Sequence, residues 1–104
     1  MDFSEFWLIY LRAHSKPLTR ALHYTGSLLT LAALMAGFWD WRALIAAPII
    51  GYAFAWAGHF GVEGNRPATF GHPVWSLVSD FRMLALFLSG RLQGHLERAN
   101  IRVE

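Results

Sequence analysis

Two long segments without Asp, Glu, Lys or Arg dominate this chain. Residues 21–39 read ALHYTGSLLTLAALMAGFW, and residues 43–62 read ALIAAPIIGYAFAWAGHFGV. Each is close to the roughly 20 apolar residues that a helix needs to cross the hydrocarbon core of a bilayer. Only residues 40–42 separate the segments, and Trp39 and Trp41 are typical of a membrane–water interface. The sequence therefore predicts an antiparallel hairpin of two membrane spans.

The rest of the chain predicts shorter helices around this hairpin. Aromatic residues share one face of residues 3–13, which are too few to span a bilayer and indicate an interfacial helix. A further helix is expected over residues 73–90, where Asp80 and Arg82 make an isolated span unfavourable. Residues 91–104 read as a polar tail. We therefore expect one all-α domain over the whole chain, an integral membrane bundle of about four helices.

The composition agrees with a membrane protein and excludes several other classes. Of the 104 residues, 55% are hydrophobic and 15% are charged, whereas soluble domains carry about 25% charged residues. The chain has no cysteine, which excludes disulfides and thiol chemistry. The net charge is +2, but the basic residues border apolar segments and form no dense patch, so nucleic acid is not an expected partner.

The basic residues also predict an orientation in the membrane. Of nine basic residues, only Arg42 lies in the turn between the two segments. The others lie on the side that the two termini share: Arg12, Lys16, Arg20, Arg66, Arg82, Arg91, Arg98 and Arg102. The positive-inside rule then places both termini in the cytoplasm. The lack of cysteine and the many alanines and arginines favour a bacterial inner membrane, with the endoplasmic reticulum as the counterpart in eukaryotic relatives.

Small residues recur along the second segment at every fourth position. Ala47, Gly51 and Ala55 form this row, and Gly58 follows near its end. Such a row permits close approach to another helix. The partner helix could belong to a second copy of the chain, so a homo-oligomer is one possible assembly.

Four of the five histidines are expected in one layer on the cytoplasmic side. His23 begins the first span and His59 nears the end of the second, so an antiparallel hairpin brings them to the same membrane face. His14 closes the short first helix, and His72 follows the loop after the second span. Glu63 lies four residues after His59, on the same face of a helix.

Several neutral imidazoles and a carboxylate at the mouth of an apolar bundle can bind a transition metal. Imidazole suits iron, copper, zinc and nickel, and two histidines with one carboxylate suit non-haem ferrous iron. Other interpretations remain open on the residues alone. His23 and His59 could ligate a haem, each could be an interfacial side chain, or Glu63 could be the proton-coupled site of a small dimeric transporter.

Three stretches resemble the membrane-bound 2-hydroxy-fatty-acid dioxygenases, which act on 2-hydroxypalmitate in fatty-acid α-oxidation. The stretches are HSKPLTRALHYTG with its spaced histidines, WAGHFGVEGNRPATF over residues 56–70, and HPVWSLVSDFRM over residues 72–83. The resemblance implies a small multi-span protein that uses ferrous iron and molecular oxygen. It further implies a 2-hydroxy fatty acid substrate, met within the lipid bilayer, and a product one carbon shorter.

Within this resemblance, His14, His23 and His59 match the motif histidines that hold the metal. His72 is shared with the shorter, bacterial-type members and is a fourth expected ligand. A 2-hydroxy acid can chelate iron through its carboxylate and its α-oxygen, so not every polar group can be a ligand while oxygen also binds.

The remaining matched residues are therefore assigned to catalysis rather than to the metal. Glu63 is expected to act as a base or as a group that orients a ligand. Arg66 or Asn65 is expected to bind the substrate carboxylate. The acyl chain would lie among the apolar side chains of the spans and enter from the lipid.

Overall fold

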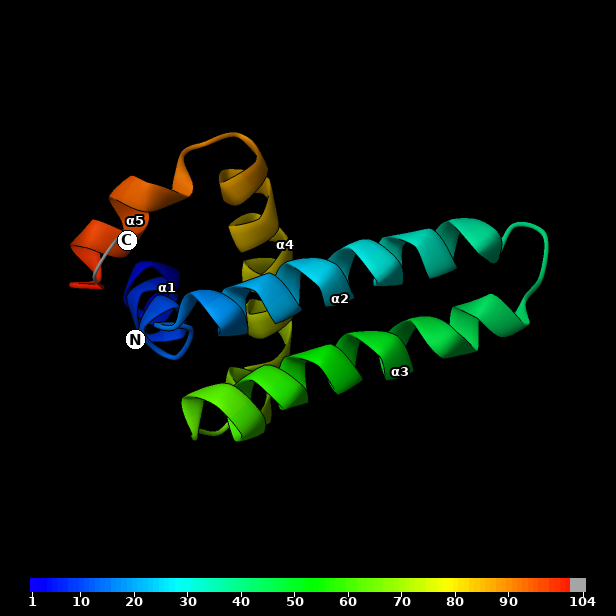
Figure 1. Ribbon diagram of the computed structural model, residues 1–104, viewed down its shortest axis with the longest axis horizontal. Coiled ribbons are helices and arrows are strands. Elements are labelled where there is room, and N and C mark those ends of the chain that lie inside the picture. Colours follow the sequence, from blue (N-terminus) through cyan, green and yellow to red (C-terminus); the bar gives the residue numbers. More distant parts are fainter. Residues whose placement is uncertain (102–104) are drawn as a thin grey trace.

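The computed structural model describes residues 1–101, and every regular element in that range is helical (Figure 1). The all-α prediction is confirmed. The elements are α1 (Phe3–Arg12), α2 (Pro17–Ala36), α3 (Arg42–Trp56), the π-helical turn η1 (Ala57–Glu63), the 3-10 turn η2 (Ala68–Phe70), α4 (Pro73–Leu88) and α5 (Leu92–Arg98). Arg102, which the orientation argument counted, lies outside the described residues.

Helices α2 and α3 form the predicted antiparallel hairpin and run side by side for most of their length (Figure 1). Glycine permits their close approach on both helices. A Cβ atom on Gly26 would lie 2.6 Å from the Cβ of Phe54, and one on Gly51 would lie 2.9 Å from the Oγ1 of Thr30. The small residues predicted to contact another helix therefore face α2 of the same chain at Gly51.

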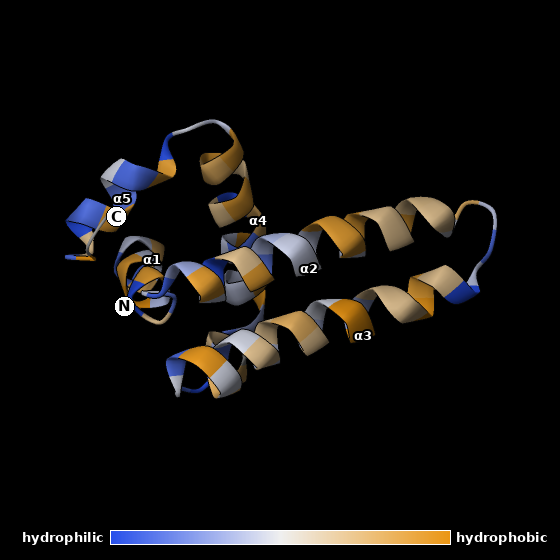
Figure 2. Ribbon diagram, in the orientation of Figure 1, coloured by the Kyte–Doolittle hydropathy of each residue, from blue (hydrophilic) through white to orange (hydrophobic). Residues whose placement is uncertain are grey.

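The hairpin is apolar, yet its large side chains are mostly exposed. Figure 2 shows the hydrophobic residues continuing to the turn at its far end. Near that turn, Phe38 is 82% exposed and Trp39 is 83% exposed. Ala47 is the one fully buried hydrophobic residue of α3. Exposed apolar surface of this extent marks a membrane or a partner rather than water.

One helix within residues 1–101 is long and apolar enough to cross a membrane, judged by length and composition. It is the continuous helix of 22 residues, Arg42–Glu63, that α3 and η1 form together. A core helix of a water-soluble protein can pass the same test but is mostly buried, whereas only 17% of the apolar window of this helix is buried. The first of the two predicted spans does not qualify, because α2 carries the polar residues Arg20 and His23 in its first half.

The compact core lies at the opposite end from the turn, between α1, α4 and α5. Its centre is formed by Phe6, Trp7, Tyr10 and Leu11 of α1 with Met83 of α4. The aromatic face of α1, predicted to lie at the interface, is thus buried against protein. The core closes around Tyr10 and Leu11, which are almost fully inaccessible.

The structure has a fifth helix that the prediction of about four helices lacked. Helix α5 lies within the stretch expected to be a polar tail, whose last residues, 102–104, lie outside the described part. Its Leu92 and Leu96 are buried in the core, and the indole N–H of Trp7 donates to Nδ1 of His95 at 3.0 Å. Two leucines four residues apart were too short a pattern to show an amphipathic helix among so many charges.

Candidate metal centre

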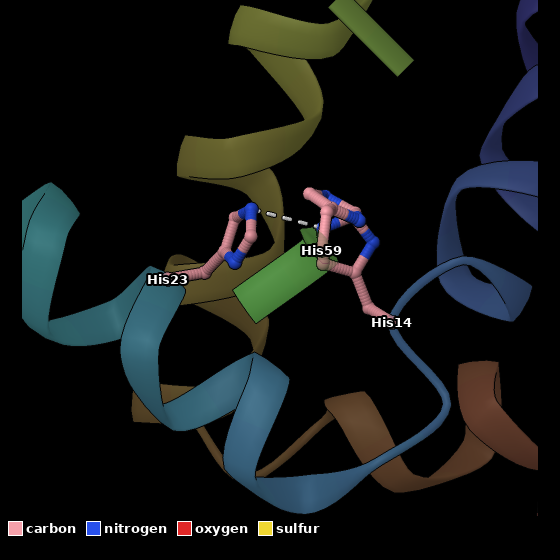
Figure 3. Close-up of side chains that lie close together, drawn as sticks. All are labelled: His14, His23 and His59. Carbon is pink, nitrogen blue, oxygen red and sulfur yellow. Dashed lines mark hydrogen bonds between the residues drawn. The ribbon is translucent and has the colours of Figure 1, made fainter. Parts of the chain in front are cut away.

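Three histidines from three different elements meet inside the protein (Figure 3). His14 follows α1, His23 lies in α2 and His59 lies in η1. Their side chains are 0%, 5% and 2% exposed, and one ring nitrogen from each lies within 4.8 Å of the others. The predicted convergence of these three residues is therefore seen in the structure.

His14 is held by the last turn of α1 and by a buried arginine. Its Nδ1 lies 2.6 Å from the backbone oxygen of Tyr10. Nη1 of Arg20 donates to the backbone oxygens of His14 and Ser15, both at 2.8 Å, and so fixes the loop between α1 and α2. Burial, with the nearby imidazoles of His23 and His59, holds the pKa of His14 well below its usual range. The ring is therefore neutral at neutral pH, as a metal ligand must be.

His23 is oriented by its own helix. Its Nδ1 lies 3.1 Å from the backbone oxygen of Thr19, one turn earlier. Gly58 allows η1 to approach this turn of α2. A Cβ at position 58 would lie 3.1 Å from the Cγ2 of Thr19 and 3.6 Å from Nδ1 of His23. A larger residue at position 58 would push His59 away from His23.

His59 is positioned by η1, the irregular continuation of α3. The helix changes to a π-helical turn at Ala57 and ends at Gly64, whose φ of 74° suits a residue without Cβ. The chain then folds back, so that the backbone N–H of Asn65 donates to the backbone oxygen of His59 at 2.9 Å. The side-chain oxygen of Asn65 lies 2.7 Å from Nδ1 of His59, and its amide nitrogen donates to the backbone oxygen of Ala13 at 3.0 Å.

These contacts determine which nitrogen of each ring is free. The acceptors facing Nδ1 are a carbonyl oxygen for His14, one for His23 and the amide oxygen of Asn65 for His59. An oxygen of this kind can only accept, so each Nδ1 carries the proton and each neutral ring keeps its lone pair on Nε2. The Nε2 atoms of His14 and His23 nevertheless lie 3.0 Å apart. Two lone pairs at this distance repel unless a cation lies between them.

The arrangement fits a transition-metal ion. Adjacent ligands at right angles, each about 2.1 Å from a metal, are about 3 Å apart. Each histidine also donates its other nitrogen to an oxygen, which is the usual support for a metal-bound imidazole. Neutral imidazoles suit iron, zinc, copper or nickel, and the donor set alone does not choose among them.

The other predicted site residues lie outside this cluster. His72 lies just before α4 and is exposed, and its ring stacks on that of Trp75, with ring centroids 5.2 Å apart. Arg66 is also exposed, and its guanidinium lies 4.9 Å from the centre of the Phe70 ring. The structure therefore does not bring His72 to the other three histidines.

Glu63 and Asn65 contact protein groups that the sequence did not indicate. Glu63 accepts a hydrogen bond from the backbone N–H of Lys16, just before α2. Residues four apart still lie near one face of η1, but the Glu63 carboxylate binds the backbone before α2 and makes no hydrogen bond to His59. Asn65 faces His59 rather than open space.

A partly buried carboxyl group near the cluster was noted in the sequence only as a charge unfavourable to a membrane span. Asp80 of α4 accepts a hydrogen bond from the hydroxyl of Tyr10, whose backbone oxygen holds His14. Burial raises the pKa of Asp80 to about 6, although the hydrogen bond from Tyr10 lowers it. Arg82, which could have paired with Asp80, instead lies 4.4 Å from the centre of a Trp7 ring. The sequence feature that could have indicated a role for Asp80 near the site is its charge within an otherwise apolar helix.

A pocket of about 470 Å³ opens beside the histidines. His23 and His59 line one end, together with Ser76 and Asp80 of α4. From there the pocket follows the hairpin, and most of its lining is apolar. A polar end at a metal centre and an apolar body suit a ligand with a polar head and a hydrocarbon tail.

Comparison of the sequence with models of known protein families gave a match. The family model described as Mpo1-like, 2-hydroxy-palmitic acid dioxygenase Mpo1-like, matches residues 1–92. The matched range includes every element that supplies a histidine to the cluster. No curated protein and no solved structure gave a match.

Proposed function

The chain belongs to the Mpo1-like family of 2-hydroxy-palmitic acid dioxygenases, and on that premise we propose that it is an iron-dependent dioxygenase of 2-hydroxy fatty acids. Ferrous iron is held by His14, His23 and His59. The reaction cleaves the bond between C1 and C2 of the acid. Its atoms balance when a 2-hydroxy acid and O₂ give the shortened fatty acid, carbon dioxide and water.

The observation that carries this proposal is the state of the three rings. Each Nδ1 is engaged by an oxygen acceptor, and the Nε2 atoms of His14 and His23 lie 3.0 Å apart. A metal ion bound between these two nitrogens would remove the repulsion of their lone pairs. Bound ferrous iron would supply the redox chemistry that activates oxygen.

The protein's own groups orient the ligands and exclude water. Asn65 and the backbone oxygens of Tyr10 and Thr19 orient the imidazoles. Burial of the rings keeps solvent from the reacting atoms. Three histidines would hold the iron and would leave it able to take a chelating 2-hydroxy acid and oxygen.

Two of the expected catalytic residues take revised roles in this proposal. Asn65 orients His59, since both ends of its amide are already engaged. Glu63 stabilises the start of α2 through the N–H of Lys16. Arg66 remains the proposed partner of the substrate carboxylate while it enters, since Arg66 is exposed and the next residue, Pro67, lines the pocket.

We place the hairpin of α2 and α3 across the membrane, with α1, α4 and α5 on the cytoplasmic side. The exposed apolar side chains of the hairpin and the tryptophans at its turn support this placement. In this placement, the polar first half of α2 and the metal centre both lie at the cytoplasmic surface of the membrane. A bacterial inner membrane is the proposed location.

Oxygen uptake by the purified protein tests the proposed function. With 2-hydroxypalmitate and ferrous iron, we expect uptake together with formation of pentadecanoate, identified by mass spectrometry. Palmitate and 3-hydroxypalmitate serve as controls, because neither can chelate a metal through an α-oxygen. Uptake without the shortened acid, or equal uptake with palmitate, would contradict the proposal.

A further inference from the structure

The pocket beside the metal centre is elongated along α3. Its lining on this helix forms two rows of every fourth residue: Pro48, Tyr52 and Trp56, and the small-residue row Ala47, Gly51 and Ala55, which ends at His59. Residues four apart in a helix lie about 6 Å apart along its axis. The row therefore extends about 18 Å from His59 toward the turn of the hairpin.

The opposite walls confirm that the pocket continues along this row. Helix α2 lines it from His23 to Leu34, which spans about 16 Å along that helix. Helix α4 covers the half nearest the histidines with Leu77 and Phe81. The charged or titratable groups of the lining are His23, Tyr52, His59 and Asp80.

The small side chains of the row have two physical consequences. At Gly51 the close contact with Thr30 of α2 explains why no side chain is present. Ala55 is different, because it is partly exposed and lines the pocket one turn from His59. A longer side chain at position 55 would project into the pocket beside the metal centre.

Resting on the proposed function, we infer that the row Ala47–Gly51–Ala55 sets the acyl-chain length of the substrate. The head of a 2-hydroxy fatty acid lies at His23 and His59, and its tail follows the row toward Leu34. Ala55 borders the first carbons of the tail, and Ala47 borders its distal part. The protein therefore accepts long saturated tails because the residues of this row are small.

Chain-length profiles of matched variants test this inference. Ala55→Leu blocks the pocket about 6 Å from His59, and Ala47→Leu blocks it about 18 Å from His59. Ala53→Leu is the matched control, because Ala53 is exposed on the same helix and does not line the pocket. Each variant is assayed with 2-hydroxyhexanoate, 2-hydroxydodecanoate and 2-hydroxypalmitate, and its iron content is measured.

We expect Ala55→Leu to lose turnover of 2-hydroxypalmitate by about tenfold or more relative to 2-hydroxyhexanoate. Ala47→Leu should shift the optimum to 2-hydroxydodecanoate, and Ala53→Leu should keep the profile of the unmodified protein. Iron content should stay unchanged in all three. If the Ala55 variant loses iron, its activity cannot be interpreted, and the chain-length profile of the Ala47 variant then tests the inference.

The outcomes separate this inference from the proposed function. If the unmodified protein shortens 2-hydroxypalmitate but both pocket variants keep its chain-length profile, the inference is overturned and the proposed function stands. The same holds if Ala53→Leu shifts the profile as strongly as Ala55→Leu. If the unmodified protein oxidises no 2-hydroxy acid, the proposed function itself fails, and the inference with it.

Discussion

The Nε2 atoms of His14 and His23 lie 3.0 Å apart, while Nδ1 of each ring faces a backbone oxygen. Both rings are buried, and burial lowers the pKa of His14 far enough to keep its ring neutral. The two lone pairs therefore face each other in a site where no solvent screens them. A cation bound between the two nitrogens would remove this repulsion.

Asn65 should control metal affinity rather than substrate affinity. Asn65→Ala removes the acceptor for Nδ1 of His59, and loss of such a support typically weakens metal binding about 10- to 100-fold. Asn65→Asp keeps an acceptor oxygen and should retain iron far better. Iron titration of the two variants makes the comparison. An Ala variant with full iron affinity and a raised KM would instead support the carboxylate-binding role expected from the sequence.

Glu63 should act through structure and not through its charge. Its carboxylate accepts the backbone N–H of Lys16, and a glutamine can accept the same bond. Glu63→Gln should therefore keep most turnover, whereas Glu63→Ala should lower the free energy of unfolding by about 1 kcal/mol. Oxygen uptake and thermal unfolding distinguish the two effects. A Gln variant that retains iron and loses turnover would identify Glu63 as the general base.

The Asp80 carboxyl should make the protein less stable as pH rises. Its pKa in the folded protein is about 6, above the value of about 3.9 in an unfolded chain. Between these values the folded state binds more protons, so stability falls as pH rises from about 4 to about 6. The loss is up to about 3 kcal/mol.

Asp80→Asn removes this titration while it keeps an acceptor for the hydroxyl of Tyr10. The melting temperature of the unmodified protein, measured against that of the variant, should therefore decrease across this pH range. Protonation of the histidines affects both proteins and cancels in the difference. Parallel curves for the two proteins would show that the buried carboxyl does not titrate in this range.

The turn of the hairpin and the termini of the chain should lie on opposite sides of the membrane. The chain has no native cysteine, so single cysteines report position without background. With an impermeant maleimide on intact spheroplasts, Asp40→Cys in the turn should react and Gln93→Cys in α5 should react only after lysis. Reaction of both before lysis would contradict a hairpin that crosses the membrane with cytoplasmic termini.

The convergence of His14, His23 and His59 could be predicted because it depends on helix order and antiparallel pairing alone. Two uncharged segments joined by a short turn place the start of one beside the end of the other. The role of Asn65 could not be predicted in this way. It depends on a π-helical turn and on the positive φ of Gly64, which return the chain to His59.

Burial of polar groups was also beyond the sequence. Arg20 was counted only as a membrane-flanking charge, yet it is 7% exposed and binds the loop that carries His14. His72 was grouped with the other histidines because only the length of its loop was known, and in the structure its ring packs against Phe6 and Trp75 instead. Such outcomes depend on how α4 packs against α1, which no local pattern in the chain specifies.

Iron content of single histidine variants tests the central claim most directly. The protein is purified after growth with iron, and iron per chain is measured for the unmodified protein and for His14→Ala, His23→Ala, His59→Ala and His72→Ala. The account predicts that the first three variants lose iron while they remain folded and membrane-inserted, and that His72→Ala keeps the full amount. Full iron in any of the first three variants, or loss of iron in His72→Ala alone, would contradict the three-histidine site.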